Sequence, residues 1–163
     1  MALLHWRSMG VRRSIALLLL AAAMACGPSA QEREARKQEI RQDLEAYLAR
    51  LAEAYASGDA EMLGGLAVKK EVASVAKLIG DLANQGLAYR PRLKQLTLEG
   101  VTVWREVNAT ATTLEVWDID KVVLGSERVL SQVRDQPHRV RYLLKRREGS
   151  WQVLYRQVDP GGG

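Results

Sequence analysis

Apolar side chains recur at intervals of three and four residues between Ile40 and Tyr55, and charged side chains occupy most positions between them. This pattern predicts an amphipathic helix of about five turns with one apolar face. Gly58 can end the helix in a left-handed conformation, and Asp59 can cap the short turn that follows. Residues 68–82 repeat the helical period, so a second amphipathic helix is predicted there.

Beyond Pro91 the apolar positions alternate with polar ones, which is typical of half-buried strands. Gly100 permits a bulge where the alternation changes phase, and residues 147–150 predict a tight hairpin turn. Five strands are expected, at 93–104, 108–118, 122–133, 139–145 and 151–158. Helices followed by antiparallel strands indicate an α+β domain in which the N-terminal helices pack on one face of a curved antiparallel sheet.

The N-terminal part of the chain has a different character. Basic residues precede an apolar run from Ile15 to Ala25. This run is too short for a membrane span, which takes roughly 20 residues. A basic segment, a short apolar segment and small residues at its end are the parts of a cleavable signal peptide.

The apolar run ends in Ala23-Met24-Ala25-Cys26, and Cys26 is the only cysteine of the chain. These residues resemble the lipobox of bacterial lipoproteins, which implies that Cys26 is acylated and becomes the new N-terminus. The alternative is ordinary cleavage after a site of small residues, which would leave a free thiol. Gly27 follows the cysteine, in place of the aspartate that keeps lipoproteins out of the outer membrane in enterobacterial sorting. This resemblance slightly favours the outer membrane, with the domain facing the periplasm.

The chain is therefore expected to have four parts. They are a signal peptide (1–25), a lipidated N-terminus with a flexible tether (26–36), an α+β domain (37–159) and a flexible tail (160–163).

Removal of the signal peptide changes the charge of the protein. The whole chain has a formal net charge of +5, but residues 26–163 carry 21 basic and 19 acidic side chains, a net charge of +2. A basic nucleic-acid-binding surface is not expected from this balance, nor in an exported protein. With one cysteine and, after cleavage, His138 as the only histidine, no metal site or cofactor is expected either.

Three segments resemble the nuclear-transport-factor-2-like superfamily, whose fold is cone-shaped and cystatin-like. The segment AYASGDAEMLGGL resembles its first helical corner, ATATTLEVWD its middle strand, and VRYLLKRREGSWQVLYRQV its closing hairpin. The order of elements is similar to a domain shared by a mitochondrial import-motor subunit and plastid-division proteins. The resemblance covers about residues 38–158 and implies a cavity between helix and sheet. It does not fix a function, because this fold hosts enzymes, carriers and interaction modules.

Two groups of side chains are candidates for binding. The first could line the cavity and accept a lipid tail or a peptide, although for most of its members ordinary core packing is the better explanation, because a domain this small needs its large residues inside; it comprises Tyr47, Leu51, Tyr55, Trp104, Trp117, Trp151 and Tyr155. The second is a basic patch for anionic groups, with a solvated strand face as the alternative; it comprises Arg139, Arg141, Lys145, Arg146, Arg147 and Arg156.

The sequence therefore predicts a lipid-anchored protein of the cell envelope with a non-catalytic binding or scaffolding domain. Its expected partners are the membrane, through the lipid on Cys26, and an envelope protein or an apolar ligand; a homodimer stays open. Two alternatives remain at this point. One is a carrier of a small apolar molecule, and the other is a small isomerase or cyclase in which Asp118 acts as the base.

The lipid anchor can be tested directly. Replacement of Cys26 by alanine should abolish the incorporation of labelled palmitate, because the acylated thiol is lost. Labelling is measured on the immunoprecipitated protein from cells grown with the labelled fatty acid. A Cys26→Ala protein that is still labelled would overturn the prediction.

Overall fold

The computed structural model describes residues 29–159. The predicted signal peptide, Cys26 and the tail from residue 160 lie outside these residues. From Arg36 onward the chain forms one compact unit, and the residues before it belong to a separate unit. All residues of the hydrophobic core lie between Ile40 and Val153, so the unit that begins at Arg36 contains the complete core.

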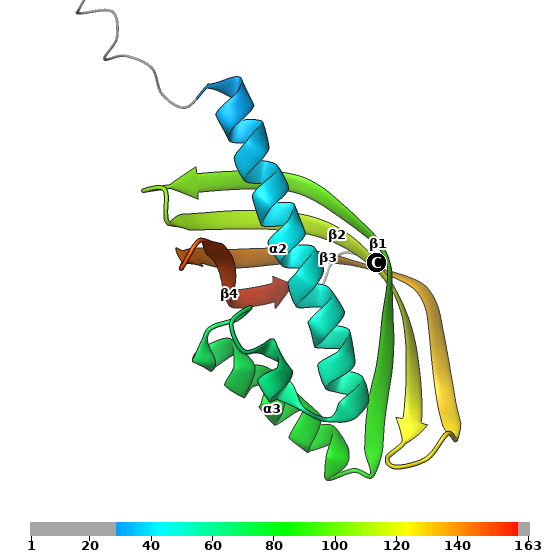
Figure 1. Cartoon of the computed structure of the whole chain (residues 1–163). Helices are drawn as coiled ribbons and strands as arrows, with labels where there is room; N and C mark the ends of the chain where they lie inside the picture. Colours follow the sequence, from blue (N-terminus) through cyan, green and yellow to red (C-terminus); the bar gives the residue numbers. More distant parts are fainter. Residues whose placement is uncertain (1–28, 160–163) are drawn as a thin grey trace, which may run out of the picture. The chain divides into compact units, whose positions relative to one another are not determined.

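Within residues 29–159, helices come first and strands follow (Figure 1). The elements are α2 (Ala30–Ser57), the 3-10 helix η2 (Ala60–Leu63), α3 (Lys69–Ala83), β1 (Leu87–Trp104), β2 (Asn108–Val123), β3 (Val129–Arg147) and β4 (Ser150–Val158). The strands form an antiparallel sheet in the order β1-β2-β3-β4. This confirms the predicted α+β class.

Helix α2 begins earlier than the sequence pattern predicts. Ser29 accepts a hydrogen bond from the Glu32 backbone N–H at 3.1 Å, and Glu32 accepts one from the Ser29 N–H at 2.6 Å. This reciprocal pair is a capping box, which starts a helix before any apolar face is available. The prediction of a flexible tether up to residue 36 is therefore wrong from Ala30 onward.

The end of α2 agrees with the prediction. Gly58 follows the helix with a φ of 81°, a left-handed conformation that glycine adopts without steric cost. Asp59 then caps η2, since its carboxylate accepts a hydrogen bond from the Glu61 N–H at 2.9 Å.

The sheet has four strands in the described residues where the sequence pattern predicts five. The predicted strand at 122–133 is wrong because Gly125, with a φ of 73°, lies in the turn that separates β2 from β3. Strand β3 then continues through Asp135, whose φ of 52° accommodates a shift of register against β2. The hairpin of β3 and β4 turns at Glu148 and Gly149, as predicted.

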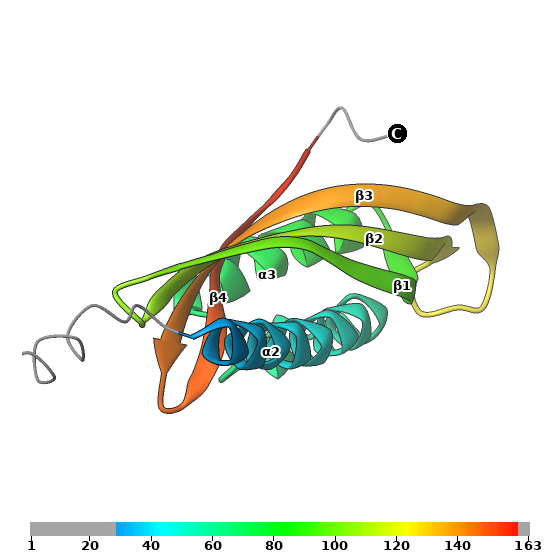
Figure 2. The same ribbon diagram turned by 90° about the horizontal axis from the view of Figure 1, so that it is seen from above.

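Both helices pack against the same sheet. Figure 1 shows α2 lying across the sheet, and Figure 2 shows it on one side of the strands. Alternate residues of β2 are buried, from Ala109 to Trp117, and Ala109, Ala111 and Trp117 belong to one core cluster with the apolar face of α2. The curved sheet therefore has an inner face that meets the helices and an outer face turned away from them.

Two glycines give a matched test of the helix boundary. Gly58→Ala should destabilise the protein by about 1 kcal/mol, because alanine is strained at a positive φ. Gly80→Ala lies inside α3, and an added Cβ there meets nothing within 4 Å. It should stabilise the protein by roughly 0.5–1 kcal/mol.

Urea denaturation of both variants measures the two free energies of unfolding. Equal effects of the two substitutions would contradict the assigned end of α2.

Candidate functional site

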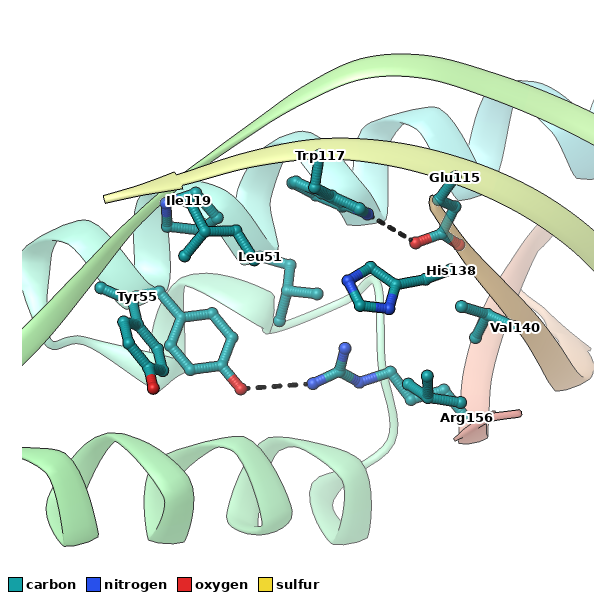
Figure 3. Close-up of a pocket in the computed structure, with 11 residues that line it drawn as sticks. Leu51, Tyr55, Glu115, Trp117, Ile119, His138, Val140 and Arg156 are labelled. Carbon is teal, nitrogen blue, oxygen red and sulfur yellow. Dashed lines mark hydrogen bonds between the residues drawn. The ribbon is translucent and has the colours of Figure 1, made fainter. Parts of the chain in front are cut away.

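A cavity of about 200 Å³ lies between the C-terminal half of α2 and the inner face of the sheet (Figure 3). Most of the side chains around it are apolar or aromatic, and three are a glutamate, a histidine and an arginine. The lining residues are Leu51, Tyr55, Tyr89, Pro91, Glu115, Trp117, Ile119, His138, Val140, Arg156 and Val158.

A bulge in β4 brings Arg156 into this cavity. Leu143 pairs with Tyr155 and Leu144 pairs with Val153, so Leu154 is an extra residue in β4. The extra residue reverses the alternation of side chains along the strand. Tyr155 consequently lies outside and is 52% exposed, whereas Arg156 lines the cavity.

Arg156 is held in place by both helices. Its Nε donates a hydrogen bond to Glu71 Oε1 at 3.1 Å, and its Nη2 donates one to the Tyr55 hydroxyl at 3.3 Å. Glu71 is only 4% exposed and also accepts a hydrogen bond from the Tyr47 hydroxyl at 2.9 Å. This set of contacts satisfies a buried carboxylate with a cation and a phenol, and it links α2, α3 and β4.

A second buried carboxylate, Glu115 on β2, has only neutral donors. Its Oε1 accepts hydrogen bonds from the Tyr142 hydroxyl at 2.6 Å and the Thr113 hydroxyl at 2.8 Å. Its Oε2 accepts one from the Trp117 indole N–H at 2.9 Å. Glu115 is 3% exposed, so these three bonds replace water around the carboxylate.

The rings of Tyr47 and Tyr142 connect the two carboxylates. They meet edge to face, with centroids 6.2 Å apart and an angle of 80° between the ring planes. Burial raises the pKa of Tyr142 well above its ordinary value, and the adjacent Glu115 carboxylate adds to the shift. Burial also raises the pKa of Tyr47; Arg156 opposes this shift and Glu71 adds to it. Both phenols therefore remain protonated donors at neutral pH.

His138 is the third polar group of the cavity wall. It pairs across the strands with Glu115, on the same inner face of the sheet. Its ring lies near the guanidinium group of Arg156 in Figure 3. No described residue forms a hydrogen bond with its ring nitrogens. His138 lies within β3.

The predicted cavity residues are only partly brought together. Leu51, Tyr55 and Trp117 line the cavity. The other four lie elsewhere: Tyr47 is fully buried behind the wall, Trp151 is in the core, and Trp104 and Tyr155 are exposed.

The predicted basic patch is divided between the two faces of the sheet. Arg139 and Arg141 are exposed on the outer face, as is Arg147 at the end of β3, and Lys145 is half-buried. The Arg139 guanidinium already pairs with Glu99, at 2.9 and 3.0 Å. Arg146 instead pairs with Glu39 at 3.3 Å and lies over the Trp151 ring, and Arg156 is inside.

Asp118 does not line the cavity. Its Oδ1 accepts a hydrogen bond from the Asp135 backbone N–H at 3.0 Å. This bond, with Lys94 and Arg134 nearby, lowers the pKa of Asp118. A base for proton abstraction needs a raised pKa and access to the substrate, so Asp118 is badly placed for the role considered in the sequence analysis.

The sequence pattern indicates that Glu115 points inward but does not indicate this for Arg156. Glu115 is in phase with the buried positions Ala109, Ala111, Thr113 and Trp117 of the same strand, so simple alternation places it inside. Alternation from Trp151 and Val153 places Tyr155 inside instead, because a bulge leaves no mark in the sequence of β4.

Comparison with known proteins supports the fold alone. No protein-family model matches the sequence, and no curated protein matches it either. The fold is similar to the intermembrane-space region of the chloroplast protein ARC6, with a TM-score of 0.63 and 17% identity over 76% of this chain and 94% of that one. It is also similar to Rv3472, a protein of unknown function from Mycobacterium tuberculosis, with a TM-score of 0.52 and 15% identity over 80% and 77% of the two chains.

A third similar structure is a proposed dehydratase of the nuclear-transport-factor-2-like family from Streptomyces avermitilis. Its TM-score is 0.51, with 12% identity over 76% of this chain and 98% of that one. The predicted resemblance in fold is thus confirmed: two helices pack on a curved antiparallel sheet of the nuclear-transport-factor-2-like type. At these sequence identities the structural similarity does not indicate a function.

The wall of the cavity can be tested through Glu115. Glu115→Gln should destabilise the protein by about 2 kcal/mol. The glutamine N–H₂ group donates hydrogen bonds and cannot accept them, so it would face donors that now bind the carboxylate. Glu99→Gln is the matched control, since it changes the same group in an exposed ion pair and should cost less than about 1 kcal/mol.

Urea denaturation of both variants gives the comparison. A Glu115→Gln variant as stable as the Glu99→Gln control would show that the three hydrogen bonds do not hold this wall.

Proposed function

We propose that this protein is a non-catalytic binding protein that holds a small, largely apolar molecule in the cavity between α2 and the sheet. The observation that carries the proposal is the cavity itself, which the surrounding side chains leave open. A domain that only scaffolds other proteins has no need of such a space, because a filled core is more stable.

The lining favours an apolar ligand of limited size. Leu51, Trp117, Ile119, Val140 and Val158 all contribute apolar side chains to the lining. Contacts of this kind bind through the removal of apolar surface from water. Its volume of about 200 Å³ is below the ~300–1,000 Å³ of pockets that hold drug-sized ligands, so the ligand is small or only partly enclosed.

The acidic residues near the cavity are not placed to act as a catalytic base, so they favour the binding function over the enzyme alternative. Asp118 lies outside it, and the oxygens of Glu115 already accept hydrogen bonds from Thr113, Tyr142 and Trp117. A general base must present a lone pair to its substrate. In this cavity Glu115 positions the wall, which favours binding over catalysis.

A lipid on Cys26 would hold the domain at the surface of the membrane, facing the periplasm. Three residues separate Cys26 from Ala30, where α2 begins, a contour length of roughly 14 Å when extended. Within residues 29–159 no helix is long and apolar enough to cross a membrane. In this proposal the lipid is the anchor of the domain that holds the cavity.

Native mass spectrometry tests the proposal. Residues 29–163 contain the complete core, and this segment should be exported, purified gently and measured before and after denaturation. A bound ligand appears as a reproducible extra mass that denaturation releases.

Two substitutions on the same strand locate the ligand. Ile119→Trp fills the cavity and should remove the extra mass, whereas Val116→Trp places the same bulk on the outer face and should retain it. A wild-type protein without bound mass, or an extra mass that persists in Ile119→Trp, would argue against the cavity as the binding site.

A further inference from the structure

The polar groups of the cavity gather on one wall. Arg156 comes from β4 and His138 from β3, and both line the cavity (Figure 3). Around them the lining consists of apolar and aromatic side chains, with Glu115 as the remaining charged residue within the described part of the chain. A ligand with an apolar body would therefore meet mostly apolar and aromatic side chains, Tyr55 and Tyr89 among them, and would meet charged or imidazole groups at one wall only.

This wall offers hydrogen-bond donors that the protein does not use. Arg156 uses Nε for Glu71 and Nη2 for Tyr55, and no described residue accepts a hydrogen bond from its Nη1. A guanidinium group has five N–H donors and no acceptor. A ligand that covers this group without accepting from it would leave charged donors unsatisfied, which is costly in a site sheltered from water.

The charge of the wall limits the kind of acceptor. Arg156 is already neutralised by Glu71 at 3.1 Å, and Glu115 brings a second buried carboxylate that has no cationic partner among its hydrogen bonds. The formal charges of Arg156, Glu71 and Glu115 therefore add up to a net negative charge. A carboxylate ligand would add another uncompensated negative charge in a poorly hydrated space.

We propose that the cavity selects a neutral, largely apolar molecule with one hydrogen-bond acceptor, such as a ketone or ester carbonyl that accepts from Arg156. This inference rests on the proposed binding function and adds the chemical class of the ligand. The carbonyl oxygen takes the donors of Arg156, and the apolar body lies between Leu51, Trp117 and Ile119.

Three probes of equal size and similar shape separate the alternatives. Acetophenone carries a carbonyl, benzoate carries a carboxylate, and isopropylbenzene has no acceptor. Each is titrated into residues 29–163, and binding is followed by NMR on the indole N–H signals. Trp117 lines the cavity, whereas Trp104 and Trp151 do not, so their signals serve as an internal control.

Acetophenone should bind and shift the Trp117 signal, and benzoate should bind at least about tenfold more weakly, because its charge is not compensated. Isopropylbenzene is more hydrophobic than acetophenone, so a direct comparison of their affinities would not isolate the hydrogen bond. The ratio of the two affinities is therefore compared between the wild-type protein and a variant.

The double variant Glu71→Gln with Arg156→Met removes both members of the buried ion pair and leaves no unpaired charge. It should lower the ratio of acetophenone affinity to isopropylbenzene affinity by about tenfold, the usual size of a hydrogen bond to a charged donor. Glu99→Gln with Arg139→Met is the matched control, because it removes an equivalent pair from the outer face and should leave the ratio unchanged.

The outcomes distinguish the two levels of the proposal. If none of the probes shifts Trp117, the cavity is not a binding site and the proposed function fails. If the probes bind but benzoate equals acetophenone, the ligand class is wrong and the binding function stands. An affinity ratio that is the same in wild type and the buried-pair variant would also overturn the role of Arg156. The comparison of benzoate with acetophenone in the wild-type protein decides the ligand class even if the buried-pair variant does not fold.

Discussion

The buried ion pair between Arg156 and Glu71 is the constraint on which the arrangement of this domain depends. A guanidinium group and a carboxylate that leave water must satisfy each other, since either one alone would be strongly destabilising. The 3.1 Å contact ties β4 to the first turn of α3, and Tyr47 and Tyr55 connect the same pair to α2. Two helices and the last strand are therefore fixed around one charged contact at the edge of the cavity.

The second carboxylate, Glu115, explains how the sheet side of the cavity keeps its shape. Its bond to Tyr142 joins β2 to β3 on the inner face of the sheet, and its bonds to Thr113 and Trp117 fix side chains along β2. These side chains cannot turn into the cavity without breaking a buried hydrogen bond. Polar contacts thus position the wall, and the remaining lining leaves a space that is charged at one wall and mainly apolar or aromatic elsewhere.

Where sequence and structure differ, the differences come from local backbone features. The capping box at Ser29 starts α2 before its apolar face begins, and Asp135 allows β3 to pass through a break in the predicted pattern. The extra residue Leu154 exchanges the expected positions of Tyr155 and Arg156. Each feature changes the phase or the length of an element but leaves its type unchanged.

The sequence by itself determined the class of fold, the order of helices and strands, the end of α2 at Gly58 and the closing hairpin. Those features follow from periodicity and from residues with special backbone preferences, which act over short distances along the chain. It also placed Leu51, Tyr55 and Trp117 in the cavity. Only the tertiary structure decided that Arg156 joins them. The reason is physical: a register shift between β3 and β4 depends on how two strands pair, and the sequence of either strand alone does not encode it.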